Sequence, residues 1–264
     1  MPQRPVDVDI RQSVKDLFLA KNEYRLVDDY VLRDGNKHPF AILIPGGGYY
    51  MVSSFIEGVP VAKQLNARGI SAFIVYYRVK KKARFPAPMD DMARAVREIF
   101  SKAEQYHLDT ENYSIWGASA GAHLAASFGT EHIGYLKYSL PRPGALVLAY
   151  PVITMNPQLT HMGSHDNLLG KDANRADEDM LSIEKHVHRN YPPTFIWCSD
   201  DDSTVPPDNT RNMTDALRQA GVPVESTIYH GVMHGAGPAT GTAAEGWIDQ
   251  AVAFWNRQSE GSNA

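Results

Sequence analysis

The chain has 264 residues, of which 43% are hydrophobic and 21% charged, as in an ordinary globular protein. Its 26 basic and 30 acidic side chains give a net charge of −4, and this acidic balance argues against nucleic acid as a partner. Because the sequence has no stretch of about 18 apolar residues and no apolar leader, we expect neither a membrane partner nor export.

Short apolar runs alternate with amphipathic stretches over most of the chain. In chain order, the predicted strands are Tyr24–Leu32 at an edge, Phe40–Ile44, Ala72–Tyr77, Tyr113–Trp116, Ala145–Tyr150, Thr194–Cys198 and Val224–Tyr229. The predicted helices are a short one around Val61 and Leu65, followed by helices at 89–103, 208–220 and 247–255. This alternation predicts an α/β fold, in which a mostly parallel twisted sheet carries helices on both faces.

The domain organisation is simple, since no internal repeat and no Pro/Gly-rich linker divides the chain. We expect one domain over residues 1–264, with residues 1–20 as an N-terminal extension and residues 259–264 as a flexible tail. The segment 152–193 holds little beyond one polar helical stretch, which predicts little or no cap domain. A single cysteine, Cys198, allows no internal disulfide and suits a reducing cytoplasm, which is the expected location.

A candidate nucleophile follows one of the predicted strands. The sequence Gly117-Ala118-Ser119-Ala120-Gly121 comes directly after that strand and opens the helix-compatible stretch 122–128. A strand, a G-x-S-x-G turn and a helix form a nucleophile elbow, in which a sharp turn exposes one serine hydroxyl. Small residues at Gly117 and Gly121 fit the close backbone approach that such a turn needs. Ser119 is therefore the candidate nucleophile.

A serine hydroxyl is a poor nucleophile and needs a base to accept its proton. His230 and His234 both follow the last predicted strand, and either could serve as that base. We favour His234, because it lies deeper in the loop and is followed by Gly235, which leaves room at an active site.

The base in turn needs an acid that orients its ring. Three consecutive aspartates follow the strand that ends at Cys198, on the carboxyl edge where open α/β sheets place their sites. Asp202 is preferred because it precedes Val205-Pro206 in a D-x-x-V-P spacing. The chain order serine, aspartate, histidine is one of the known layouts of serine hydrolases.

A glycine-rich segment offers donors for a developing oxyanion. Pro45-Gly46-Gly47-Gly48-Tyr49-Tyr50 follows a predicted strand, where lipases and esterases carry an HGGG-type loop. We expect the main-chain N–H groups of Gly47, Gly48 and Ala120 to form the oxyanion hole.

Aromatic side chains beside this loop are candidates for substrate binding. Tyr49, Tyr50 and Phe55 could offer stacking faces to a substrate, although packing inside the protein is an equally good explanation for them.

These motifs resemble the α/β-hydrolase superfamily, and within it the compact bacterial esterases grouped with acetyl-xylan esterase and hormone-sensitive-lipase-like enzymes. The resemblance runs from Ala41 to His234. It includes Pro45-Gly46-Gly47-Gly48-Tyr49, Glu57-Gly58, Tyr77-Arg78, Pro88-Met89-Asp90-Asp91, the elbow, Asn167-Leu168-Leu169-Gly170, Pro192-Pro193-Thr194-Phe195 and Asp201-Asp202-Ser203-Thr204-Val205-Pro206. The chain departs from the commonest pattern at Pro45, which replaces a histidine, and at Ala122, which replaces a second glycine.

The resemblance implies a serine carboxylesterase with the triad Ser119, Asp202 and His234, acting through an acyl-enzyme without a cofactor. The expected substrate is a small-molecule ester of a short acyl group, acetyl above all, with acylated sugars among the candidates. Two alternatives stay open: a C–N hydrolase of the same fold, such as an aryl formamidase or small peptidase, and a non-catalytic ligand-binding protein. Edge strands or the C-terminal helix could also pair subunits in a homo-oligomer.

Other clusters of residues that could bind a metal give weaker evidence for a site. His161-x-x-x-His165-Asp166 and His186-x-His188 have metal-like spacings, but lone surface histidines at such spacings usually bind nothing. The run Asp200 to Asp202 lacks the glycine that a calcium loop needs. We therefore expect no metal.

Overall fold

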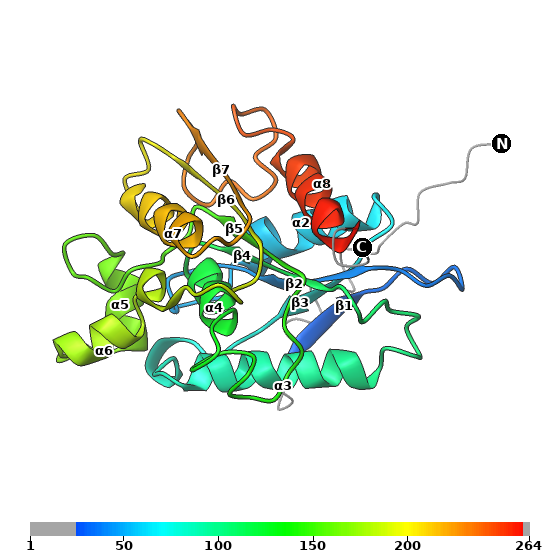
Figure 1. Cartoon of the computed structure of the whole chain (residues 1–264), viewed down its shortest axis with the longest axis horizontal. Coiled ribbons are helices and arrows are strands. Elements are labelled where there is room, and N and C mark those ends of the chain that lie inside the picture. The colour runs from blue at the N-terminus through cyan, green and yellow to red at the C-terminus, as the bar shows by residue number, and fades with distance from the viewer. Residues whose placement is uncertain (1–24, 261–264) are drawn as a thin grey trace.

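The computed structural model describes residues 25–260, and its centre is a seven-stranded sheet (Figure 1). The strands are β1 Val27–Tyr30, β2 Phe40–Ile44, β3 Ser71–Val75, β4 Ser114–Ala118, β5 Ala145–Ala149, β6 Thr194–Ser199 and β7 Val224–Tyr229. Their order across the sheet is β1-β3-β2-β4-β5-β6-β7. Only β1 runs antiparallel to its neighbour, and the remaining pairs are parallel.

Helices cover both faces of this sheet. They are α2 Val59–Asn66, α3 Ala87–Ser101, α4 Ala120–Phe128, α5 Met162–Leu168, α6 Arg175–Met180, α7 Asp208–Gln219 and α8 Trp247–Glu260, with shorter turns η1 Ser54–Gly58, η2 Lys80–Lys82 and η3 Ile183–His186. The apolar sides of α3, α4 and α7 share one core with the sheet, whereas α2 and α8 share the other (Figure 1). Within residues 25–260, no helix is long and apolar enough to cross a membrane.

The structure confirms the predicted α/β fold class and its mostly parallel sheet. The bounds of β2 and β7 agree with the predicted strands residue for residue, and the other strands differ from them only at their ends. Every residue of β2, β3, β4, β5 and β6 is buried, because helices cover both faces of the sheet. Continuous apolar runs therefore located these strands correctly.

Of the two predictions about the ends of the chain, the structure describes only part of the one about the C-terminal tail. The expected tail from 259 onward is wrong at its start, because Ser259 and Glu260 still belong to α8. The hydroxyl of Ser259 donates to the carbonyl of Trp255, one turn back, and accepts from the Asn112 side chain. These contacts extend the helix beyond its apolar stripe. The predicted extension at residues 1–20 and residues 261–264 lie outside the described residues.

The segment between β5 and β6 contains more helices than predicted. It holds α5, α6 and the turn η3, where we expected a single helical stretch. An imidazole–carboxylate contact of 3.3 Å joins His165 on α5 to Glu178 on α6. These short helices lie together at one end of the molecule (Figure 1), and they are too small to form a separate cap.

The turn between β4 and α4 depends on two glycines. A Cβ atom on Gly121 would lie 2.0 Å from the carbonyl oxygen of Ile44, and one on Gly117 would lie 2.5 Å from the Cα of Ala122. Both contacts are with backbone, which cannot rotate away as a flexible side chain would. The close approach expected from the sequence is thus present at both positions.

We predict that Gly121→Ala lowers the stability of the fold by about 3 kcal/mol or more, because a methyl group must displace the end of β2. Gly69→Ala is the matched control: its Cβ would meet no atom within 4 Å, so only the left-handed backbone at φ +76° opposes it. That variant should lose about 1–2 kcal/mol. Urea unfolding monitored by circular dichroism measures both, and equal losses would contradict the packing argument.

Candidate active site

Ser119 occupies a strained turn between β4 and α4. Its φ of 53° and ψ of −123° lie outside the regions that non-glycine residues favour. The neighbouring strand holds the turn in place: the N–H of Ser119 donates to the carbonyl of Ala149 at 3.0 Å, and its carbonyl accepts from Val152 at 3.1 Å. Strain maintained in this way is typical of functional sites.

The side chains of Ser119, His234 and Asp202 form one hydrogen-bonded line. His234 Nε2 lies 2.8 Å from Ser119 Oγ, and His234 Nδ1 lies 2.7 Å from Asp202 Oδ2. Because an ionised carboxylate only accepts, Nδ1 carries the proton and Nε2 is left to accept the serine hydroxyl. Three side chains predicted from separate loops are therefore in contact in the required order.

Asp202 is held as an ion at one end of this line. Its side chain is 1% exposed, and its Oδ1 accepts from the N–H groups of Thr204 at 2.8 Å and Val205 at 3.0 Å. Burial alone would raise the pKa of Asp202, but hydrogen bonds from His234, Val205 and Thr204 outweigh it and hold the pKa below its usual value. The D-x-x-V-P spacing that selected Asp202 reflects these backbone bonds.

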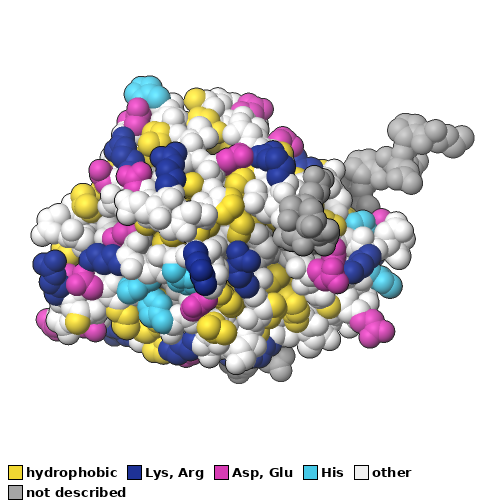
Figure 2. Space-filling model, in the orientation of Figure 1, with side chains coloured by type: hydrophobic (Ala, Val, Ile, Leu, Met, Phe, Trp, Pro, Cys, Tyr) yellow, Lys and Arg dark blue, Asp and Glu magenta, His cyan; other side chains and the backbone are white. Residues whose placement is uncertain are grey.

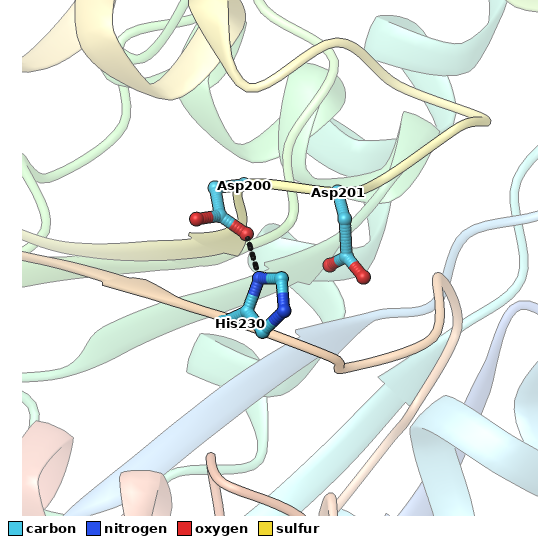
Figure 3. Close-up of side chains that lie close together, drawn as sticks. All are labelled: Asp200, Asp201 and His230. Atoms are coloured by element: carbon cyan, nitrogen blue, oxygen red, sulfur yellow. Dashed lines mark hydrogen bonds and ion pairs between the residues drawn. The ribbon is translucent and has the colours of Figure 1, made fainter.

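The other histidine of the same loop lies apart from Ser119. His230 pairs instead with Asp200 at 2.8 Å, and its side chain is 81% exposed (Figure 3). The Asp200 hydrogen bond raises the pKa of His230. Asp201, which Figure 3 shows beside the same ring, accepts from Ser199 Oγ at 2.5 Å and from the N–H of Gly231 at 3.1 Å. These contacts join the loops after β6 and β7.

The glycine loop after β2 lies directly against the nucleophile. A Cβ on Gly46 would lie 2.7 Å from the Cβ of Ser119, so only glycine permits this approach. Gly47 and Gly48 have φ values of +118° and +63°, which bend the loop over the serine. Within residues 25–260, no hydrogen bond occupies the N–H groups of Gly47, Gly48 or Ala120. The predicted oxyanion donors are therefore available, and their role stays a prediction.

These groups line one cleft of about 460 Å³. Its walls comprise Gly47, Gly48, Tyr50, Met51, Ser53, Glu57, Ser119, His161, Gly163, Asn167, Thr204, His234 and Gly235. The cleft is large enough for a small ligand and is lined by groups from at least four loops.

The structure corrects part of the predicted aromatic set. Tyr49 is 1% exposed, and its hydroxyl donates to Nδ1 of the buried His123 at 2.8 Å, so its ring fills the core beneath the loop. Phe55 is 65% exposed but does not line the cleft. Tyr50 does line it, with 57% of the residue exposed and the Lys80 ammonium 5.0 Å from its ring centre. Of the three, only Tyr50 is placed to stack on a substrate.

Sequence reasoning missed three cleft residues from the β5–β6 segment, His161, Gly163 and Asn167. The Asn167 amide donates to the carbonyl of Gly48 at 2.9 Å, which fixes the glycine loop from the opposite wall. The His161 ring lies against the same glycine and accepts from the N–H of Ser164 at 3.2 Å through Nδ1. Burial lowers the pKa of His161. Asn167 belonged to a motif of the resemblance, whereas His161 carried only a metal-like spacing.

The geometry predicts which of the two histidines is needed for activity. His234→Ala should reduce kcat by several orders of magnitude, because Ser119 then has no base. His230→Ala should leave kcat within about twofold, since its ring touches only the exposed Asp200. Hydrolysis of a chromogenic acetyl ester measures both, and a large loss in the His230 variant would contradict the assignment.

A second prediction concerns the acid. Asp202→Asn should lower kcat by about 10⁴, since the amide cannot hold the ring in the required tautomer. Activity of the unmodified protein should fall in acid, because only a neutral imidazole can accept the serine proton, whereas the lowered pKa of Asp202 favours its ionised form. A pH–rate profile tests this, and a rate that stayed flat down to about pH 4 would count against a histidine base.

Comparison with known proteins identifies similar chains. The BD-FAE family profile matches residues 29–217, which include Ser119 and Asp202 and stop short of His234. An endo-1,4-beta-xylanase B from Butyrivibrio fibrisolvens is 36% identical over 230 residues, and an acetylxylan esterase from Xylanibacter ruminicola is 32% identical over 201 residues. The alignments cover 83% and 75% of this chain, which spans only 35% and 41% of those relatives.

Solved structures of similar length also match. An acetyl ester-xyloside bifunctional hydrolase from Caldicellulosiruptor lactoaceticus is 33% identical, with a TM-score of 0.80 over 88% of this chain and 87% of that one. A sugar hydrolase from Lactococcus lactis is 26% identical, with a TM-score of 0.75 over 89% of this chain and 94% of that one. Both share the fold described above.

Proposed function

We propose that this chain, which belongs to the BD-FAE family of α/β hydrolases, is a serine esterase that removes short acyl groups, acetyl above all, from carbohydrates. The observation that carries the proposal is the line of hydrogen bonds from Ser119 through His234 to Asp202, at the floor of a cleft that the glycine loop borders. The names of the relatives, an acetylxylan esterase and an acetyl ester-xyloside hydrolase, support the choice of substrate class.

The reaction follows from the positions of the protons. His234 Nε2 accepts the hydroxyl proton as Ser119 Oγ attacks the ester carbonyl, and the oxyanion gains hydrogen bonds from the N–H groups of Gly47, Gly48 and Ala120. The ester C–O bond then breaks, and the imidazolium gives its proton to the departing alcohol oxygen. Water repeats the sequence on the acyl-enzyme and releases the acid. Serine, histidine and aspartate carry each step, so the mechanism calls for no cofactor.

The cleft suits a small ester whose alcohol part carries hydroxyl groups. His161, Asn167 and Thr204 present polar groups along its walls, and Tyr50 offers an exposed ring. Sugar rings combine hydroxyl groups with apolar faces, so they match a wall of this composition. The xylanase name belongs to a relative of which this chain spans 35%, so the proposal is limited to ester cleavage.

The catalytic role of Ser119 predicts a loss that is confined to chemistry. Ser119→Ala should lower kcat by several orders of magnitude and abolish labelling by a fluorophosphonate probe, while the melting temperature changes little. Ser127→Ala, at a buried serine of α4 whose hydroxyl bonds only the carbonyl of His123, is the matched control and should still be labelled. A Ser119 variant of near-normal activity would defeat the proposal.

The substrate class predicts a ranking of esters. We expect kcat/KM to fall from acetyl to butyryl to octanoyl esters, and acetylated xylo-oligosaccharides to be better substrates than acetyl esters of simple alcohols. The ratio of kcat/KM values reports how well each transition state is bound. Preference for octanoyl esters would contradict the short-chain assignment.

Cleavage of a C–N bond is the alternative outcome of the same assay, because a serine triad also hydrolyses amides. An N-formyl arylamide tested beside an acetyl ester separates the two activities. Failure of the fluorophosphonate probe to label the unmodified protein would instead favour a non-catalytic, ligand-binding role.

We also propose a cytoplasmic location, a single domain over residues 1–264, and self-association as a homo-oligomer. The buried free thiol of Cys198 supports a reducing compartment. Cell fractionation and light scattering test the location and the oligomeric state.

A further inference from the structure

Glu57 is a buried carboxylate beside the nucleophile that the triad mechanism leaves without a role. It lies in η1, a single turn of π-helix, is 7% exposed, and lines the same cleft as Ser119 and His234. A buried carboxylate costs free energy unless it is hydrogen-bonded, and irregular π-turns often occur at functional sites. Contacts that offset the cost of burying Glu57 must therefore be present.

The contacts of Glu57 join two loops of the site. Its Oε2 accepts from the N–H of Gly46 at 2.7 Å, at the base of the glycine loop. The hydroxyl of Tyr150 interacts with the same carboxylate and accepts from the N–H of Gly237 at 3.1 Å. Gly237 lies in the loop that carries His234.

Tyr150 connects this carboxylate to the base as well. Its ring meets the His234 imidazole edge to face, with centroids 5.0 Å apart and planes at 65°. A Cβ on Gly235 would approach Glu57 Oε1 to 4.0 Å, so the carboxylate also lies close to the backbone next to His234. Movement of Glu57 would therefore disturb both the glycine loop and the imidazole.

We propose that Glu57 is a positioning residue for the esterase reaction: its carboxylate fixes the glycine loop through Gly46 and the His234 ring through Tyr150. This inference rests on the proposed esterase function, since it assigns Glu57 to the alignment of the oxyanion donors with the base. Glu57 touches neither substrate nor proton in this role, and acts through the two loops that it joins.

The charge of Glu57 adds an electrostatic part to this role. The titratable groups that face it are Tyr77, Tyr150 and His234, while Asp202 and His161 face His234 from other loops. Burial raises the pKa of Glu57 above its usual value, and the Gly46 hydrogen bond, the Tyr150 hydroxyl and the charge of His234 offset only part of this rise. In its ionised form, the carboxylate favours the imidazolium that forms in each transition state.

The test compares Glu57→Gln and Tyr150→Phe with the unmodified protein. Glu184→Gln is the control, because Glu184 is a half-buried carboxylate that also has a raised pKa and belongs to η3, away from the cleft lining. The substrate is a chromogenic acetyl ester, and kcat, KM and the pH profile of kcat/KM are measured for each variant, with circular dichroism as a check of folding.

We expect Glu57→Gln to lower kcat by about 10-fold to 10²-fold with KM within about twofold, because small displacements of catalytic groups act on the transition state. Its acidic limb should move to lower pH, since removal of a negative charge disfavours the imidazolium. Tyr150→Phe, which keeps the ring and removes one link, should lower kcat less and leave the limb in place. Glu184→Gln should match the unmodified protein.

Two outcomes would overturn the inference. One is a folded Glu57→Gln variant with unchanged kcat and an unshifted acidic limb. The other, which applies even if that variant does not fold, is a Tyr150→Phe variant with unchanged kcat. Absence of activity and of probe labelling in the unmodified protein would instead refute the esterase proposal, so the two failures are distinguishable.

Discussion

The site depends on backbone-to-backbone contact between the turn at Ser119 and the end of β2. Ile44 pairs with Gly117 in the parallel register of β2 and β4, so both strands stop at the same edge of the sheet. Beyond that point the chain leaves no space for a side chain at Gly46 or Gly121. The sheet itself therefore sets the separation of Ser119 from the base of the glycine loop, and the side chains of Glu57 and Asn167 then hold the rest of that loop.

Asp202 and His234 reach this edge through a second pair of strands. Ser199 and Tyr229 pair at the ends of β6 and β7, so the two loops begin side by side. Beyond the strands, Asp200 bonds His230 and Asp201 bonds the N–H of Gly231. Figure 3 shows this cluster across the two loops. It extends the pairing of the two loops outside the sheet, while the direct bond of 2.7 Å between Asp202 and His234 sets their separation.

The sequence predicted the strands and the line of Ser119, His234 and Asp202, but not the side chains that pack around that line. The strands were found because buried parallel strands are continuous apolar runs, and Ser119 was found because the strain of its turn demands small neighbours within a few residues. Asp202 was selected through the spacing to Val205, which its carboxylate contacts directly. Tyr49 was misjudged because its partner, His123, is 74 residues away in the chain. Asn167 and His161 were missed for the same reason, since nothing near them in sequence reveals that they face Gly48.

The hydrogen bond from Asn167 to the Gly48 carbonyl shows that different segments of the chain supply different parts of this site. The β5–β6 segment supplies one wall of the cleft and supports the glycine loop, yet the hydrogen-bonded line of Ser119, His234 and Asp202 lies wholly outside it. Substitutions in α5 that spare Asn167 can therefore change the shape of this cleft wall while Ser119, His234 and Asp202 keep their geometry. A wall and a hydrogen-bonded line that lie in different segments of the chain can be altered one at a time.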